Sequence, residues 1–288
     1  MELKWRNRAI NLSSGALMGI LNVTPDSFSD GGLFTTLHPA VEQARAIIAA
    51  GASIIDVGGE STRPGAATVT IEEECERVLP VIEALNRLRH DGEFTALVSI
   101  DTRKAEVARA ALAAGADLVN DVTGLRDPAM RDVCAEYGVP AVLMHLRGTP
   151  ETLRWSQETQ PFTDVVSEVR DELAELARGA LAAGVPSVIL DPGFGFGKSV
   201  AQNLDLIRRL DEIRVLGYPL LLGASRKSTL GRITGIAAPE QRDAASIAAH
   251  LYGLLKGADI LRVHDVAGHA QAVQIWQKLS ETSESNYG

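Results

Sequence analysis

The sequence has little cysteine and lacks any long apolar run. Its two cysteines, Cys75 and Cys134, form no Cys-x-x-Cys pair, so neither a disulfide framework nor a zinc site built on thiols is expected. No stretch approaches the length of about 18 apolar residues that suggests a membrane span. The run Ala16 to Leu21 is too short for a secretory signal. We therefore expect a cytoplasmic protein in a reducing compartment.

Basic residues are also in the minority. The chain has 28 Lys and Arg against 37 Asp and Glu, which gives a net charge of −9. Because a surface that binds phosphate backbones needs clustered basic residues, nucleic acid is not an expected partner. A hydrophobic content of 45% over 288 residues supplies a core for one large barrel or two ordinary domains. No linker divides the chain, so we predict one domain over residues 1–288, with a core of about 16–280 and a polar tail at 281–288.

Short apolar runs recur along the chain and read as buried parallel strands. Each gap between them has room for a helix, since the starts of successive runs lie 21 to 46 residues apart. The eight runs are Ala16 to Leu21, Ser53 to Val57, Leu97 to Ile100, Leu118 to Val119, Ala141 to Met144, Ser187 to Leu190, Leu220 to Leu222, and Ile260 to Val263.

Several signals place helices in these gaps. Apolar residues from Val165 to Ala180 recur at helical spacing, and Thr70-Ile-Glu-Glu73 forms a capping box. Asp127-Pro128 supplies an N-cap followed by proline at the first helical position. Pro80 is expected to interrupt or kink the helix that begins after Thr70.

Glycines that end helices stand just before the strands. Gly51, Gly115 and Gly257 each precede Ala and then an apolar run, and Gly184 is a looser fourth copy. Repeated strand-helix units in a chain of this length predict a single α/β domain, a (β/α)8 TIM barrel. A doubly wound open sheet is the lesser alternative.

Polar residues follow almost every apolar run. A single one is as well explained by a helix cap or a turn, but chemistry in such barrels gathers at the carboxyl ends of the strands. We therefore predict an active site at that rim. The residues are Asn22, Asp56, Asp101, Asn120, Asp121, His145, Asp191, Ser225 to Ser228, Arg262 and His264.

The stretch from Ser187 to Lys198 shows this arrangement most clearly. An apolar strand stops at Asp191, and Pro192 ends its hydrogen-bond ladder. Gly197-Lys198-Ser199 resembles the tail of a phosphate loop, but Pro192 stands where that motif needs glycine. The glycines also miss the dinucleotide-binding spacing. With both motifs rejected, we interpret this stretch as a flexible loop beside the fixed carboxylate of Asp191.

The types of residue at the rim narrow the class of possible ligands. The acceptors Asp101, Asn120 and Asp191 suit a donor-rich edge such as that of an aminopyrimidine. The cationic group suits an anion, and it comprises Arg63, Lys227, Arg262 and His264. Because no His/Cys cluster has zinc spacing, any metal would be a hard ion such as Mg²⁺ shared with substrate phosphates.

The motifs together resemble dihydropteroate synthase from about residue 16 to 275. The segments that carry this resemblance are Ile20 to Asp30, Asp56 to Gly65, Ser99 to Thr102, Asn120 to Val122, Asp191 to Lys198, Ser225 to Ser228 and Arg262 to Val266. The resemblance implies a (β/α)8 barrel that joins 6-hydroxymethyl-7,8-dihydropterin diphosphate to 4-aminobenzoate, with Mg²⁺ as cofactor and a homodimer as the assembly.

The resemblance also implies residue roles. Asp101, Lys227, Arg262 and Asn22 would be catalytic, and Asn22 would bind the metal. The pterin would be held by Asp101, Asn120, Met144, Asp191, Lys227 and Arg262. The diphosphate would be held by Asn22, Thr62, Arg63, Arg262 and His264. The 4-aminobenzoate would be held by Phe28, Thr62, Pro64, Phe196, Lys227 and Ser228.

Two rival functions share part of this pattern. A pterin-binding methyltransferase barrel would keep the pterin acids but has no need for Ser225 to Ser228 together with Thr62-Arg63-Pro64. A non-catalytic pterin-binding protein would be expected to lack the residues that bind diphosphate and Mg²⁺, whereas Asn22, Arg63, Arg262 and His264 are all present. Small molecules are therefore the expected partners, with no membrane and no nucleic acid.

Overall fold

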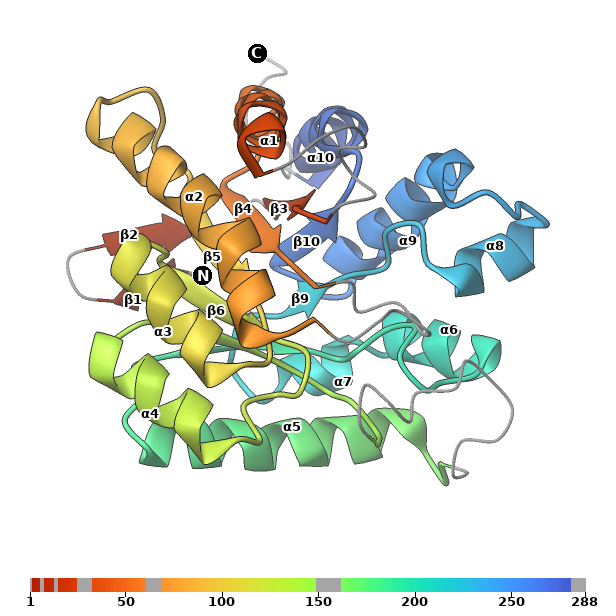
Figure 1. Ribbon diagram of the computed structural model, residues 1–288. Helices are drawn as coiled ribbons and strands as arrows, with labels where there is room; N and C mark the ends of the chain where they lie inside the picture. Colours follow the sequence, from red (N-terminus) through yellow and green to blue (C-terminus); the bar gives the residue numbers. More distant parts are fainter. Residues whose placement is uncertain are drawn as a thin grey trace, which may run out of the picture.

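Eight parallel strands form a ring surrounded by helices (Figure 1). The computed structural model describes residues 2–5, 8–12, 15–24, 33–60, 69–148 and 162–280. The strands of the ring are β3 (Ala16–Asn22), β4 (Ile54–Gly58), β5 (Leu97–Asp101), β6 (Leu118–Asp121), β7 (Ala141–Met144), β8 (Val188–Asp191), β9 (Leu221–Leu222) and β10 (Ile260–Val263).

The strand order confirms the predicted barrel. The sheet runs β8-β7-β6-β5-β4-β3-β10-β9, and a parallel bridge between Leu190 and Leu220 brings its two ends together. Each strand overlaps one of the predicted apolar runs. The open doubly wound sheet is therefore wrong.

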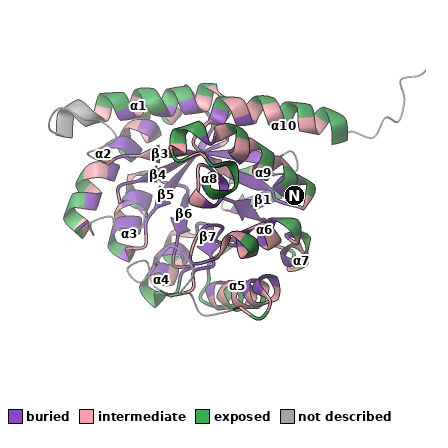
Figure 2. Ribbon diagram, turned by 90° about the vertical axis from the view of Figure 1, so that its right-hand side faces the viewer, coloured by how far each residue is buried: buried purple, intermediate pink, exposed green. Residues whose placement is uncertain are grey.

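Helices follow the strands and cover the outside of the ring. Figure 2 shows the strands buried at the centre and the outer faces of the helices exposed. The helices are α1 (Leu33–Ala49), α2 (Ile71–His90), α3 (Ala105–Ala114), α4 (Pro128–Tyr137), α5 (Val165–Ala182), α6 (Val200–Arg208), α7 (Asp211–Arg214), α8 (Ser228–Thr234), α9 (Asp243–Leu255) and α10 (Val266–Ser280).

Most of the predicted local signals are confirmed. Thr70 and Glu73 form both hydrogen bonds of the capping box, and Asp127 accepts from the N–H of Ala129 at 2.9 Å. Gly115 ends α3 with a φ of 116°, a value that favours glycine. The predicted interruption at Pro80 is wrong, because α2 continues through it. Buried side chains on both sides of the proline anchor this helix against the core.

The period of two along a strand divides the core. One set of side chains, including Leu17, Ile55 and Val98, packs outward against the helices. The alternate set, including Ile54 and Leu97, points into the ring near the amino ends of the strands. In most strands, the inward-facing residue two or four positions further along is polar. These polar residues mark the carboxyl end of the ring as the location of the site.

An N-terminal hairpin closes the amino end of the ring. Strands β1 (Glu2–Trp5) and β2 (Arg8–Asn11) pair antiparallel. Leu3 and Trp5 are each 4% exposed and pack with the inward apolar residues of the barrel strands. This hairpin was not predicted from the sequence because each strand is only four residues long, although polar and apolar residues alternate in β1.

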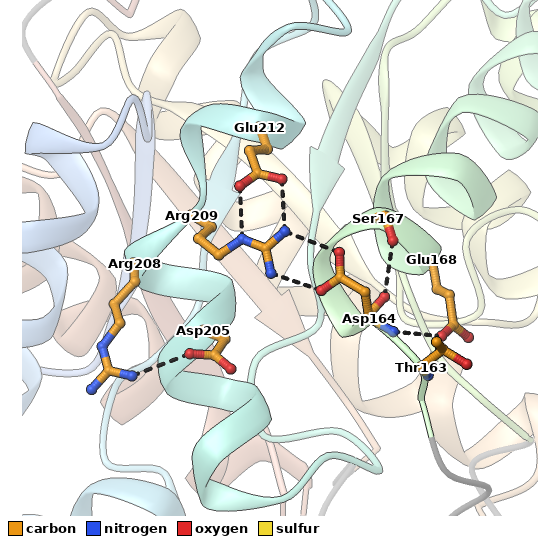
Figure 3. A network of polar contacts seen from close by, with 8 residues as sticks. All are labelled: Thr163, Asp164, Ser167, Glu168, Asp205, Arg208, Arg209 and Glu212. Atoms are coloured by element: carbon orange, nitrogen blue, oxygen red, sulfur yellow. Dashed lines mark hydrogen bonds and ion pairs between the residues drawn. The ribbon is translucent and has the colours of Figure 1, made fainter.

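Ion pairs also join the outer helices. Arg209 binds the carboxylate of Asp164 at 2.7 and 2.9 Å and that of Glu212 at 2.7 and 2.9 Å (Figure 3). These contacts connect the start of α5 to the segment between α6 and α7. Since Arg209 and Asp164 are each 38% exposed, we expect them to contribute about 1 kcal/mol or less. Burial at the two ends of the barrel therefore matters more for stability.

The hairpin yields a stability prediction. Trp5→Ala removes a buried ring from the amino end of the barrel and should lower the free energy of unfolding by about 3–5 kcal/mol. Urea unfolding followed by circular dichroism measures this change. Val215→Ala, at a position that is 74% exposed, should change stability by less than about 0.5 kcal/mol. Equal effects of the two substitutions would contradict the packing role of Trp5.

Candidate active site

Charged and amide side chains from four strands meet at the carboxyl end of the barrel. Asp56 of β4 is completely buried, and its Oδ2 accepts from Arg262 Nε at 2.6 Å and from Asn120 Nδ2 at 2.9 Å. Arg262 Nη2 also donates to Asp101 Oδ2 at 2.5 Å. One guanidinium therefore bridges two carboxylates inside the barrel.

The register of the strands brings Asn22 to the same rim. Asn22 lies opposite Gly58, Gly58 lies opposite Asp101, and Asp101 lies opposite Asn120. These residues form one row across β3, β4, β5 and β6. Gly58 has no side chain, and a Cβ built there would contact the side chain of Asp101 at 3.5 Å. The glycine therefore leaves open space next to the Asp101 side chain.

A second group lies at β8 and the loop that follows it. Asp191 Oδ1 accepts from the N–H of Gly193 at 2.7 Å. Lys227, at the start of α8, donates to the carbonyl oxygen of Phe194, and its Nζ lies 4.3 Å from the ring centroid of Phe196. Met144 of β7 packs in the same small cluster as Phe196. The strand-end acid, the lysine and an apolar wall are therefore adjacent.

Several hydrogen bonds hold the loop after Asp191, which was predicted from the sequence to be flexible. Lys198 is buried, and its ammonium donates to the carbonyl oxygens of Gly193 at 2.9 Å and Phe196 at 3.2 Å. Asn203 Oδ1 accepts from the N–H of Gly195 at 2.7 Å. Gly193 has a φ of 68°, and a Cβ there would lie 2.0 Å from the carbonyl oxygen of His145. Only glycine fits this approach.

His264 and Ser225 meet at the adjoining edge of the rim. Ser225 Oγ lies 2.9 Å from His264 Nδ1 and accepts from the N–H of His264 at 3.1 Å. Ser228 begins α8, next to Lys227. The structure thus brings most of the predicted residues that it describes to one rim. Phe28, Thr62, Arg63 and Pro64 lie outside the described residues.

Two polar residues predicted for the rim have other partners. Asp121 follows Asn120 and points outward, where it accepts from the N–H groups of Thr123 at 2.8 Å and Leu125 at 3.0 Å. It is a turn acid. His145 is buried, its ring Nε2 lies 3.4 Å from Glu172 of α5, and burial lowers its pKa to about 4. Strand parity could have separated both residues from the site.

Asp56 and Lys198 have several contacts in the structure, but no role was predicted for them from the sequence. Each was noted as part of a motif, Asp56 as a polar strand end and Lys198 in the glycine-rich loop. Asp56 shares the inward parity of Ile54, which is a usable signal. For Lys198, the sequence offers no signal beyond a lysine in a glycine-rich loop.

Burial controls the charges at the rim. It raises the pKa of the Asp101 carboxyl to about 7, although Arg262 favours the ionised form. It also lowers the pKa of the Lys227 ammonium to about 7, against the attraction of Asp191. Burial raises the pKa of Asp191, and Lys227 acts in the opposite direction. Burial thus acts against the charged forms of these three groups, and a bound charge or dipole can shift their ionisation.

Fold and site together define a (β/α)8 barrel whose rim combines buried acceptors with cations. Residues 18–264 match the family described as pterin binding enzyme. The chain is 42% identical to the dihydropteroate synthase of Escherichia coli, with 99% of both chains covered. The structure of Xanthomonas albilineans dihydropteroate synthase with 4-aminobenzoic acid has a TM-score of 0.86 at 46% identity and covers 95% of this chain and 96% of that one.

The match extends to a longer relative. The chain is 51% identical, over 90% of its length, to a probable bifunctional folylpolyglutamate synthase/dihydropteroate synthase of Haloferax volcanii, of which it spans 30%. The full-length matches decide the assignment. The chain belongs to the dihydropteroate synthase family.

The raised pKa of Asp101 predicts how stability depends on pH. Between pH 4 and 7 the folded state retains a proton that the unfolded carboxyl has lost, so this contribution to stability falls as the pH rises through that window. Asp101→Asn removes the titration. In urea unfolding, the stability of the wild type relative to this variant should fall from pH 4 to 7 and level off above it. A difference that rises or stays constant over that range would contradict the assignment.

Proposed function

We propose that this chain joins 6-hydroxymethyl-7,8-dihydropterin diphosphate to 4-aminobenzoate, forming 7,8-dihydropteroate and diphosphate, as a transferase of folate synthesis. The observation that carries the proposal is the buried set of acceptors, Asp101, Asn120 and Asp191, beside the cations Lys227 and Arg262 at one rim. Such a site matches a ligand with a donor-rich heterocycle at one end and an anion at the other.

The acceptors are assigned to the pterin. Asp191 has one oxygen bound to the N–H of Gly193, which fixes the carboxylate and leaves the other oxygen for the aminopyrimidine edge. Asn120 is oriented by its bond to Asp56, so its amide oxygen is available for a ligand donor. Lys227 supplies a donor on the same side. Together these groups fix the pterin ring in one orientation.

The reaction assigned to the site is a dissociative substitution. As the bond to diphosphate breaks, the methylene carbon becomes electron-poor and the leaving group gains negative charge. Asp101 lies where a carboxylate can favour the positive charge on the pterin, and Arg262 and His264 are assigned to the departing anion. The amine nitrogen of 4-aminobenzoate then forms a bond to this carbon with its lone pair, and the resulting cationic nitrogen releases one proton to solvent. Phe196, Met144 and Ser228 are assigned to the wall that excludes competing water.

Magnesium is assigned to Asn22 and the substrate diphosphate. Among the described residues, no group of three or more His, Cys, Asp or Glu could hold a metal alone. Mg²⁺ is commonly bound through one or two protein oxygens and substrate phosphates, and the single amide of Asn22 at the rim fits that mode. When bound, the ion would neutralise charge on the leaving diphosphate.

The assembly and the compartment belong to the same proposal. Tyr252 and Leu255 of α9 and Ile275 and Leu279 of α10 are large apolar side chains that are 44–81% exposed on two neighbouring helices. Exposed apolar side chains of this kind are often buried in a subunit interface, so they support a homodimer. Light scattering would measure the mass of the assembly. Both cysteines are free, which agrees with the cytoplasm. No helix among the described ranges is long and apolar enough to cross a membrane.

One assay tests the activity. The purified protein is incubated with the pterin diphosphate, 4-aminobenzoate and Mg²⁺, and 7,8-dihydropteroate is measured by chromatography. Product that depends on both substrates is expected. Folded protein that forms no product would overturn the proposal, whereas methyl transfer from a methylated pterin would favour the methyltransferase reading.

The assignment of Asp191 gives a prediction for ligand affinity. Asp191→Asn should weaken binding of the pterin diphosphate about tenfold or more, because it removes charge from the donor-facing edge, and should change 4-aminobenzoate binding less. Calorimetry measures both constants. Asp117→Asn is the matched control, since Asp117 is equally buried, at 5% exposure, but lies at the amino end of the barrel beside Arg89. Unchanged pterin affinity in Asp191→Asn would contradict its role.

The assignment of Asn22 gives a separate prediction for the metal. Asn22→Ala should raise the Mg²⁺ concentration needed for half-maximal activity by about tenfold, while pterin affinity measured without Mg²⁺ stays near that of the wild type. The assay is a Mg²⁺ titration at saturating substrates. An unchanged Mg²⁺ requirement would remove Asn22 from the metal site.

A further inference from the structure

Helix α9 presents three acceptors to the loop that carries Lys227. The carboxylate of Asp243 binds Arg226 Nε at 2.7 Å and Nη2 at 2.8 Å. Ser246 Oγ accepts from the N–H of Arg226 at 2.9 Å, and His250 Nε2 accepts from the N–H of Ala224 at 3.0 Å. Positions 243, 246 and 250 lie on one face of a helix. This face, which we call the α9 acceptor face, meets the loop from Ala224 to Lys227.

The loop needs these contacts because its backbone is strained. Arg226 has a φ of 59°, in the left-handed region that non-glycine residues rarely adopt. Its N–H donates to Ser246, its side chain binds Asp243, and its carbonyl oxygen accepts from Arg242 Nη1 at 2.8 Å. A strained residue persists where its surroundings fix it in this way. The next residue is Lys227, whose ammonium reaches the site.

The protonation of His250 follows from its partners. Its Nε2 faces the N–H of Ala224 and must accept, so the ring is neutral and carries its proton on Nδ1. That proton points at His269 Nε2, 2.8 Å away, and His269 Nδ1 in turn lies 2.6 Å from the carbonyl oxygen of Asp265. Both rings are therefore neutral with Nδ1 protonated. The chain of hydrogen bonds connects the loop after β9 to the loop after β10.

These histidines lie outside the catalytic rim. His250 is completely buried and His269 is 1% exposed, and they belong to α9 and α10, the helices that pack outside β9 and β10. The hydrogen-bond chain ends at Ala224 and at Asp265, one residue from Ser225 and from His264 respectively. Ser225 and His264 are themselves hydrogen-bonded at 2.9 Å. The two loops are thus fixed to each other both at the rim and behind it.

We propose that His250 is a positioning residue, which fixes the loop from Ala224 to Lys227 through its neutral Nε2 and thereby sets the position of the Lys227 ammonium. His269 holds His250 in the tautomer that can accept, and Ser246 completes the α9 acceptor face. The proposal rests on the proposed function, because Lys227 is assigned there to the pterin.

Two substitutions at one position separate this role from simple filling of the core. In His250→Gln the amide oxygen reaches the place of Nε2 and can accept from Ala224. In His250→Asn the shorter amide reaches only the place of Nδ1 and leaves that N–H without an acceptor. We expect His250→Asn to raise KM for the pterin diphosphate about tenfold with kcat within about threefold, and His250→Gln to stay within about threefold in both. Equal losses in the two variants would overturn the proposal.

Coupling to Lys227 is the second readout. If His250 acts through Lys227, then adding His250→Asn to a Lys227→Ala variant should cause no further loss of pterin affinity by calorimetry. Fully additive losses would show that His250 does not act through the lysine. Should His250→Asn fail to fold, Ser246→Ala takes its place in the cycle. It removes the acceptor of Arg226 with little change in volume, and the same KM increase is expected.

The protonation of His250 can be tested without any activity. Nitrogen-15 NMR of histidine-labelled wild-type protein at pH 7 should show His250 neutral with Nδ1 protonated. A ring protonated on Nε2 or on both nitrogens could not accept from Ala224 and would overturn the proposal even if the enzyme is active. Conversely, an inactive wild type with the expected tautomer would refute the proposed function and leave the hydrogen-bond arrangement intact.

Discussion

The structure depends on the pairing of charged groups that are buried inside the barrel mouth. An isolated buried carboxylate is strongly unfavourable, and three of them, Asp56, Asp101 and Asp191, stand at inward positions within one ring of strands. Arg262 lies between Asp56 and Asp101, and Lys227 compensates Asp191. A cation from another strand or loop faces each of these acids. Removing one partner would leave the other uncompensated.

The same constraint explains why the two described loops after β8 and β9 are held by many hydrogen bonds. Lys227 can face Asp191 only if the strained backbone at Arg226 is held, and the α9 acceptor face supplies the contacts that hold it. The loop after Asp191 is fixed in a comparable way by Lys198 and Asn203. Positions behind the rim therefore determine the geometry of groups that would meet the ligand. This arrangement agrees with the general need for precise placement in catalysis.

The sequence was sufficient to predict the barrel, because apolar runs recur with room for a helix between them, several follow a helix-ending glycine, and most end at a polar rim residue. The inward or outward direction of a rim residue follows from the strand period of two, which distinguishes Asn120 from Asp121. The pairing of the charged rim residues could not be predicted from the sequence. Arg262 and Asp56 are 206 residues apart, and many other pairings among the rim charges fit the sequence equally well. The short hairpin of Leu3 and Trp5 was missed for lack of length, and the break expected at Pro80 was wrong because buried neighbours outweigh one lost hydrogen bond.

We propose that the buried acceptors at the rim hold the pterin ring while the cations face its diphosphate. A crystal structure of the protein with 6-hydroxymethyl-7,8-dihydropterin diphosphate would show the position of both groups. We expect the aminopyrimidine edge within hydrogen-bond distance of Asp191 and Asn120, with the diphosphate toward Asn22 and His264. A pterin ring bound outside the strand ends, or in the reverse orientation with its diphosphate against Asp191, would contradict it.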